Sequence, residues 1–100
     1  MAKGYWIGRV DVTSDEDYKP YAAGNQAIFK KFGGRYVIRA GRFERAEGNA
    51  RSRNVVIEFP DYATALACYH SPEYQQNKKL RLPYSTADIV IIEGYDRPQP

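Results

Sequence analysis

The sequence has few residues that carry covalent or metal chemistry. It contains one cysteine, one histidine, one methionine and one tryptophan among 100 residues. The single cysteine, Cys68, excludes a disulfide within the chain and a metal cluster built from cysteines of one chain. With His70 as the only histidine, a zinc site is not expected either. Because the sequence also lacks a glycine-rich phosphate loop and a nucleophile elbow, we predict neither a metal nor a cofactor.

Long hydrophobic runs and clustered positive charge are also missing. No apolar run approaches the roughly 20 residues that a membrane-spanning helix needs. Residues 1–4 lack the apolar stretch of a secretory signal, so we expect a cytoplasmic protein that does not contact a membrane. The formal net charge is +3, and the basic residues are interleaved with Asp and Glu along the chain. Since a nucleic-acid footprint requires clustered basic residues, we predict no nucleic-acid partner.

What the sequence does contain is tyrosine, which accounts for nine of the 14 aromatic residues. Tyrosine buries an apolar ring while presenting a hydroxyl, and it is common at interfaces and pockets. The hydrophobic fraction of 43% is sufficient for one core at this length. We therefore predict a single domain over residues 1–96, followed by a loose tail at 97–100.

Periodicity and capping residues predict the element order βαββαβ. Thr13 or Ser14 can cap the first helix, and Gly33–Gly34 can end it in the left-handed conformation. Pro20 inside this helix predicts either a kink or a main helix that begins near Pro20. The predicted strands are 4–12, 35–40, 54–59 and 88–95, with a further extended piece at 42–46, and the other helical pieces, capped by Asp61 and Ser71, are 62–70 and 72–80.

This order is the split βαβ pattern of the ferredoxin-like fold, an α+β fold with a four-stranded antiparallel sheet and its helices on one face. The other face would be uncovered, yet apolar residues are predicted to point that way if the register is simple. An exposed apolar patch of this size is typical of an interface, and a closed two-fold dimer is the commonest solution. We therefore predict a homodimer formed through the open sheet face. The residues predicted on this face are Trp6, Val10, Val37, Val56, Ile89 and Ile91.

Three stretches carry a resemblance to a known family: Gly33–Gly41, Val56–Pro60 and Cys68–Gln75. With them, nearly the whole chain resembles domain-of-unknown-function family 1330, and the Ser-Pro-Glu-Tyr segment after a helix is the most specific part. The resemblance implies a dimeric α+β barrel, in which two ferredoxin-like subunits face their sheets together. Members of that superfamily include cofactor-free monooxygenases of aromatic polyketides and muconolactone isomerases. The resemblance implies no settled activity and no functional residue.

Charged residues on the predicted dimer face are the first candidates for a functional site. Arg39 and Glu58 fall among apolar neighbours, where an unpaired charge is costly to bury. They would pair with each other, with the partner subunit or with a polar ligand. A structural salt bridge is the simpler interpretation. The functional one is an arginine that fixes a substrate carboxylate and a glutamate that moves protons.

Further candidates lie on the helices. Tyr21 and Asn25 share the inward stripe of the first helix and can orient a carbonyl or phenol in a pocket there, although a core tyrosine and a half-exposed asparagine are a plainer explanation. His70, at the end of its helix, is the only histidine that can act as a general base, but a role at the helix C-terminus is simpler. We interpret the basic stretch Arg51–Arg53 as a solvated hairpin tip.

The sequence therefore predicts a small homodimer that binds an organic, acidic or aromatic metabolite in a pocket between sheet and helices. A catalytic version would be a cofactor-free oxygenase or isomerase, with Arg39 anchoring the substrate, Glu58 or His70 as base, and Tyr21 and Asn25 orienting it. The alternative is a non-catalytic dimeric binding or structural module whose polar residues form interface salt bridges. An open cavity lined by these groups favours the first hypothesis, and a filled, fully paired core favours the second.

Overall fold

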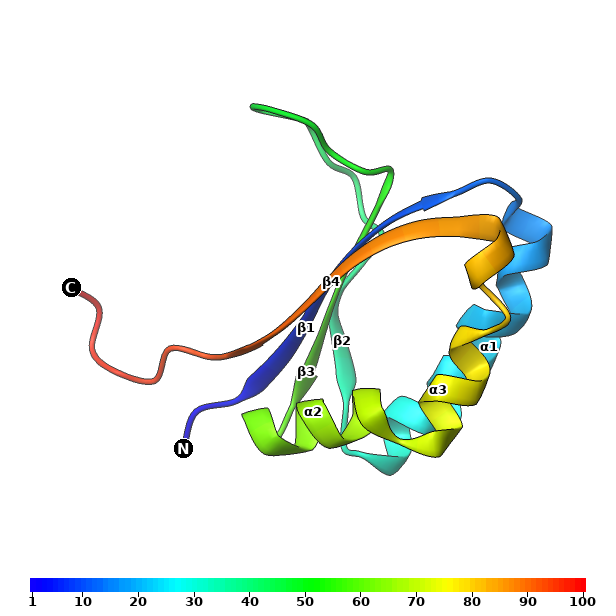
Figure 1. Cartoon of the computed structure of the whole chain (residues 1–100). Coiled ribbons are helices and arrows are strands. Elements are labelled where there is room, and N and C mark those ends of the chain that lie inside the picture. Colours follow the sequence, from blue (N-terminus) through cyan, green and yellow to red (C-terminus); the bar gives the residue numbers. More distant parts are fainter.

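The computed structural model describes residues 1–100 and contains one antiparallel sheet packed against three helices (Figure 1). The strands lie in the order β2-β3-β1-β4. This is the predicted βαββαβ order, with the second helical region divided in two. No helix combines the length and the apolar character needed to cross a bilayer. The elements are β1 (Gly4–Val12), α1 (Asp15–Lys31), β2 (Arg35–Arg39), β3 (Arg53–Phe59), α2 (Tyr62–His70), α3 (Pro72–Lys78), a 3₁₀ turn (Leu82–Tyr84) and β4 (Ser85–Glu93).

Local side-chain chemistry sets the ends of α1. Ser14 caps it as predicted, because its hydroxyl accepts a hydrogen bond from the Asp17 backbone N–H at 3.3 Å and donates one to the Asp17 carboxylate at 2.8 Å. Gly33 follows the last turn with a φ of +73°, a conformation that glycine adopts without strain. The helix begins at Asp15, so a start near Pro20 is wrong. The cap and the acidic first turn stabilise the residues before the proline.

The caps of α2 and α3 are also the predicted ones. The Asp61 carboxylate accepts the Thr64 backbone N–H at 2.7 Å, and the Ser71 hydroxyl accepts the Tyr74 N–H at 3.2 Å. Ser71 is both the C-cap of α2 and the N-cap of α3, so the chain turns between the two helices there. The bounds differ elsewhere: α3 ends at Lys78, β4 begins at Ser85, and residues 42–46 form no strand.

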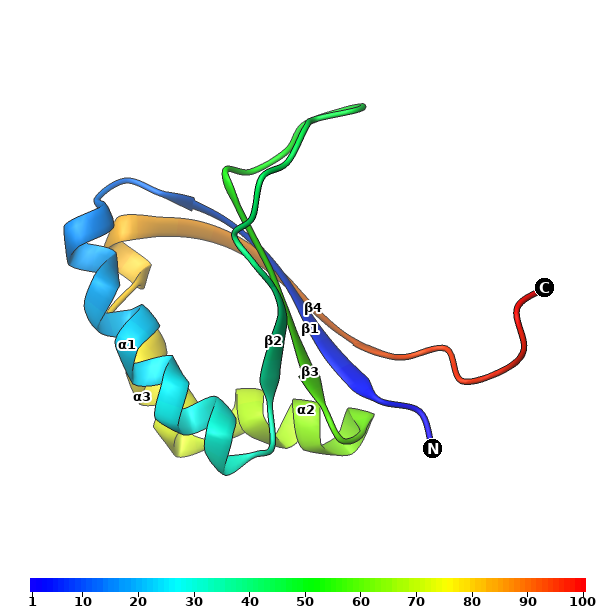
Figure 2. The ribbon, with the colours of Figure 1, turned by 180° about the vertical axis from the view of Figure 1, so that it is seen from behind.

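All three helices cover one face of the sheet and leave the other bare (Figures 1 and 2). The prediction that Trp6 and Val10 lie on the bare face is wrong, because both are buried against the helices. It is also wrong for Ile91, the cross-strand partner of Trp6, and for Ile89, two residues along on the same side. Strand β1 is apolar on both faces, so alternation alone does not choose between them, and the largest side chain goes to the core.

The bare face is nevertheless apolar at its centre, through a different set of side chains. Val56 lies there as predicted, whereas Val37 is exposed at a register shift between Tyr36 and Ile38 in the β2–β3 pairing. This shift places Ile38 opposite Val56. The apolar side chains of the bare face are Ile7, Ile38, Val56, Val90 and Ile92.

The core is an aromatic cluster centred on Trp6. Its indole Nε1–H donates to the Ala65 carbonyl of α2 at 2.8 Å, which fixes the ring beneath the helices. The ring centroids of Tyr74 and Phe29 lie 4.9 and 5.0 Å from it in edge-on geometry. Cys68 packs in the same cluster, and burial raises the pKa of its thiol to about 12. This cluster joins all three helices to the sheet.

Candidate ligand-binding recess

A recess lies between α1 and the helix-covered face of the sheet. It offers about 30 Å³ of room for a water-sized molecule, within a wider space of about 460 Å³ that includes open solvent. The smaller volume can hold a water molecule, and a larger ligand would extend into the wider space. The walls are mostly aromatic and aliphatic, from Trp6 and Ile57 on the sheet and Phe29 on the helix. Such walls with a few polar groups are typical of small-molecule sites.

The structure brings the predicted residues Tyr21 and Asn25 together in this recess. They belong to a stripe on α1 whose members recur at helical spacing, so their side chains point to the same side. All four members are buried: Tyr18, Tyr21, Asn25 and Phe29.

Asn25 is held in place by α3 and keeps free hydrogen-bonding capacity. Its side-chain oxygen accepts from the Asn77 amide at 2.9 Å, and the same Asn77 amide donates to the Tyr21 carbonyl at 3.0 Å. The amide NH₂ of Asn25 has no partner among the hydrogen bonds of the protein. It is therefore a donor that a ligand in the recess can use.

Tyrosine hydroxyls gather at this site, and burial raises the pKa of two of them, Tyr18 and Tyr74. The hydroxyls of Tyr21 and Tyr74 lie 2.8 Å apart. Burial, and to a smaller extent the neighbouring Tyr21, raises the pKa of Tyr74 far above its usual range. Burial also raises the pKa of Tyr18, which lines the recess. Tyr18 therefore presents a protonated phenol to a ligand in the recess.

Two arginines, Arg53 and Arg81, also line the recess, and neither is predicted as a site residue from the sequence. The sequence predicts Arg53 at a solvated hairpin tip, but it is the first residue of β3 and faces the helices. Its position in phase with Val55 and Ile57 is the signal that could have shown this. Arg81 follows α3 in a charged stretch, and no local pattern indicates its burial. No aspartate or glutamate lines the recess.

Of the three predicted alternatives for Arg39 and Glu58, pairing with each other is wrong, because Glu58 pairs with Arg35. Beyond the register shift, Arg39 lies opposite Val55, and its guanidinium stacks on the Tyr36 ring with 4.5 Å from Cζ to the centroid. Tyr36 lines the recess, so Arg39 lies beside it without lining it. Glu58 instead projects from the bare face.

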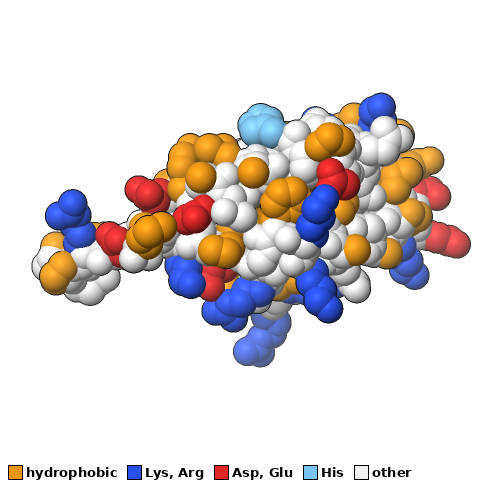
Figure 3. Space-filling model, turned by 90° about the horizontal axis from the view of Figure 1, so that it is seen from below, with side chains coloured by type: hydrophobic (Ala, Val, Ile, Leu, Met, Phe, Trp, Pro, Cys, Tyr) orange, Lys and Arg blue, Asp and Glu red, His pale blue; other side chains and the backbone are white.

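Glu58 and His70 both lie outside the recess. The Glu58 carboxylate accepts hydrogen bonds from the Tyr5 hydroxyl and the Arg35 Nε, each at 2.9 Å. These two bonds, the one from Tyr5 first, hold the pKa of Glu58 below its usual value, which makes it a weaker base. His70 is exposed at the end of α2, and Figure 3 shows the single histidine, in pale blue, on the surface.

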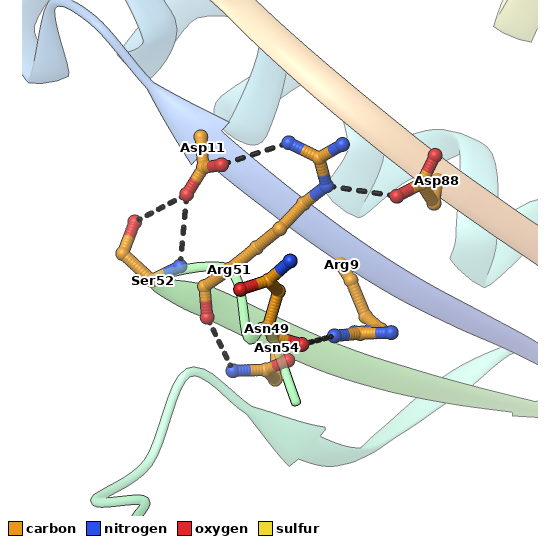
Figure 4. Close-up of polar contacts among 7 residues, drawn as sticks. All are labelled: Arg9, Asp11, Asn49, Arg51, Ser52, Asn54 and Asp88. Atoms are coloured by element: carbon orange, nitrogen blue, oxygen red, sulfur yellow. Dashed lines mark hydrogen bonds and ion pairs between the residues drawn. The ribbon is translucent and has the colours of Figure 1, made fainter. Parts of the chain in front are cut away.

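A second, more polar hollow of about 370 Å³ lies where the β2–β3 connection returns to the sheet. There the Arg51 guanidinium donates to the carboxylates of Asp11 at 2.7 Å and Asp88 at 2.8 Å (Figure 4). Arg9 donates to the Asn49 carbonyl at 2.9 Å. Arg51 is thus no solvated tip: its charge is satisfied within the chain, so this cluster holds the connection against β1 and β4.

The sheet order, the helices on one face and the recess beneath α1 define a ferredoxin-like α+β protein. A family model described as a domain of unknown function (DUF1330) matches residues 3–95. The chain therefore belongs to this family, as the resemblance of its three stretches implied. No curated protein matches the chain.

Several solved structures share the fold. A protein of unknown function from Rhodopseudomonas palustris superposes with a TM-score of 0.75 at 17% identity, over 96% of this chain and 85% of its own. SnoaB, a cofactor-independent oxygenase from Streptomyces nogalater, gives 0.67 at 16% identity over 97% of each chain. A dimeric ferredoxin-like protein of unknown function from a Jannaschia species gives 0.63 at 12% identity, over 91% of this chain and 98% of its own. At these identities the likeness shows the fold alone.

Proposed function

We propose that this protein is a homodimer in which each subunit binds a small organic metabolite, acidic or aromatic, in the recess between α1 and the sheet. The observation that carries the proposal is the combination of aromatic walls with polar groups that keep free donors, namely the buried Nε of Arg81 and the amide NH₂ of Asn25. A purely structural module is expected to pair such groups internally, since unpaired buried donors are costly. The recess therefore favours a ligand-binding protein.

The bare sheet face supports the dimeric part of the proposal. Ile7, Val90 and Ile92 are neighbours on adjacent strands, and each exposes more than a third of its surface. Apolar side chains gathered in this way are typical of an interface. The similar protein from Jannaschia is described as dimeric, which agrees with this arrangement.

Native mass spectrometry of the protein as purified tests both parts at once, because it reports the oligomeric state and any retained small molecule. We expect a dimer for the wild type. Ile92→Glu should give a monomer, because a charge would be buried at the interface. The matched control is Leu82→Glu, since Leu82 is 54% exposed against 47% for Ile92 but lies on the 3₁₀ turn. A wild-type monomer at micromolar concentration would contradict the dimer.

For the chemistry, we propose cofactor-free oxygenation or isomerisation of the bound ligand. It is supported by the fold shared with a cofactor-independent oxygenase and by the protonated Tyr18 phenol of the recess. In this proposal Tyr21 and Asn25 orient the ligand, and Arg39 anchors it from beside Tyr36. Oxygen uptake and product analysis with aromatic acids test it, with Tyr21→Phe and Arg39→Ala as variants. Absence of turnover with every ligand that binds would leave a non-catalytic binding protein.

The role of Glu58 or His70 as a base stays a prediction. Neither lies in the recess, so either would have to act on a ligand held elsewhere, such as against the bare face. Glu58→Gln and His70→Ala test these roles by the loss of turnover with unchanged binding.

A further inference from the structure

Arg81 is buried without a counter-charge. It is 6% exposed, and its Nε has no hydrogen-bond partner. None of the four ion pairs of the protein includes it. Its guanidinium lies over the Tyr21 ring, 5.4 Å from Cζ to the centroid. Stacking on a ring offsets part of the cost of burial, and the neutral Tyr21 and Tyr74 hydroxyls lie near the guanidinium, but neither pairs Nε nor supplies a negative charge.

The backbone around Arg81 is fixed, so the side chain does not enter the interior through a loose segment. Its N–H donates to the Lys78 carbonyl at 3.1 Å. Its carbonyl accepts from the Tyr84 N–H at 2.9 Å and from the Ser85 hydroxyl at 2.8 Å. An arginine held in this way, with no acidic partner, is a site at which an anion would be stabilised.

Arg53 adds a second positive charge to the recess that Arg81 lines. Its guanidinium lies over the Tyr18 ring, 5.5 Å from Cζ to the centroid, and it takes part in no ion pair. The recess thus contains two arginines and no carboxylate. Of its other polar groups, the Asn25 amide NH₂ is a donor as well, and the tyrosine hydroxyls can both donate and accept. The complement to such a set is a ligand group that only accepts hydrogen bonds and carries negative charge.

The recess is polarised along α1. Tyr18 and Tyr21, in the early turns, carry the two arginines stacked on their rings. Phe29, two turns further on, packs with Trp6 and forms the apolar end. A ligand that satisfies both ends has a compact anionic group attached to an apolar or aromatic body.

We propose that Arg81 and Arg53 form a carboxylate subsite, and that the ligand of the recess is a small monocarboxylic acid whose apolar body points toward Phe29. This inference rests on the proposed ligand-binding function and narrows its ligand class from acidic or aromatic to acidic. A carboxylate fits because it offers planar acceptor oxygens to a planar guanidinium fork.

The test uses matched pairs of probes that differ only in charge: benzoate with benzamide, phenylacetate with phenylacetamide, and hexanoate with hexanamide. Binding to the full chain is followed by amide chemical shifts and by calorimetry. We expect each acid to bind about tenfold or more tightly than its amide. Arg81→Met should remove that difference by weakening the acid about tenfold and leaving the amide nearly unchanged. Arg53→Met should act in the same direction, and the exposed control Arg42→Met should change neither.

A second readout separates a ligand subsite from a structural role. In Arg81→Met, the melting temperature of the ligand-free protein should be unchanged or higher, because the substitution removes an unpaired buried charge. If Arg81→Met does not fold, Arg53→Met and Arg81→Lys carry the binding test. Equal binding of acids and amides in the recess would overturn the carboxylate subsite while the proposed binding function stands. If no probe shifted the recess signals, both would be overturned.

Discussion

Gly24→Ala should destabilise the protein, although alanine is the better helix former. Gly24 lies inside α1, where the substitution alone is expected to stabilise by about 1 kcal/mol. A Cβ at this position would lie 2.4 Å from Oδ1 and 2.9 Å from Cγ of Asn77. Asn77 would have to turn away and give up its hydrogen bonds to the Tyr21 carbonyl and the Asn25 side chain.

The two lost hydrogen bonds are worth about 1 kcal/mol each, and leaving the buried Asn25 oxygen without a partner costs about another 1 kcal/mol. Against the helix gain of about 1 kcal/mol, the net destabilisation is about 2 kcal/mol. For a domain of this size that lowers Tm by about 10 °C.

A double-mutant cycle measured by urea denaturation isolates the effect. In an Asn77→Ala background the obstruction is absent, so Gly24→Ala should stabilise by about 1 kcal/mol. The sign of the substitution therefore reverses between the two backgrounds. Stabilisation by Gly24→Ala in the wild-type chain would refute the packing of Asn77 against α1.

Three further perturbations follow from the structure. Trp6→Phe removes the hydrogen bond to the Ala65 carbonyl and leaves a void, so unfolding followed by circular dichroism should show a loss of about 2–4 kcal/mol. The raised pKa of Cys68 favours its protonated form in the folded state. Its contribution to the free energy of unfolding is therefore complete below pH 9 and is lost as pH rises toward 12. Thiol labelling at pH 8 should accordingly be limited by unfolding, and fast labelling of the native protein would contradict this burial. Arg51→Met breaks two partly exposed ion pairs and should lower the urea midpoint of unfolding only slightly, with the difference shrinking in 1 M NaCl.

Features set by neighbouring residues were predictable from the sequence. The caps Ser14, Asp61 and Ser71 each bond to a backbone N–H three residues along, so the pattern in the sequence contains the whole interaction. The glycine that ends α1 is equally local. The element order followed from these signals, and the order in turn limited the topology.

Features set by packing across the fold were not predictable in the same way. The apolar residues of β1 alternate on both faces, so the position of Trp6 depends on which face the helices cover. The antiparallel register places Arg35 rather than Arg39 opposite Glu58, and the shift after Tyr36 sets Arg39 opposite Val55; neither leaves a local trace in the sequence. Of the recess, Tyr21 and Asn25 could be found from helical spacing, whereas Arg81 reaches it through a contact with Tyr21, which is far away in the sequence.

The position of Trp6 makes the protein its own optical probe. Trp6 is the only tryptophan, and it lies both at the centre of the core and in the wall of the recess. A single fluorophore therefore reports on folding and on occupancy of the recess without a label. Because its ring contacts Phe29 and Tyr74 directly, a ligand that displaces water or moves either side chain changes the surroundings of the excited indole. Quenching or a shift of its emission can serve as the primary readout when compounds are screened against this fold.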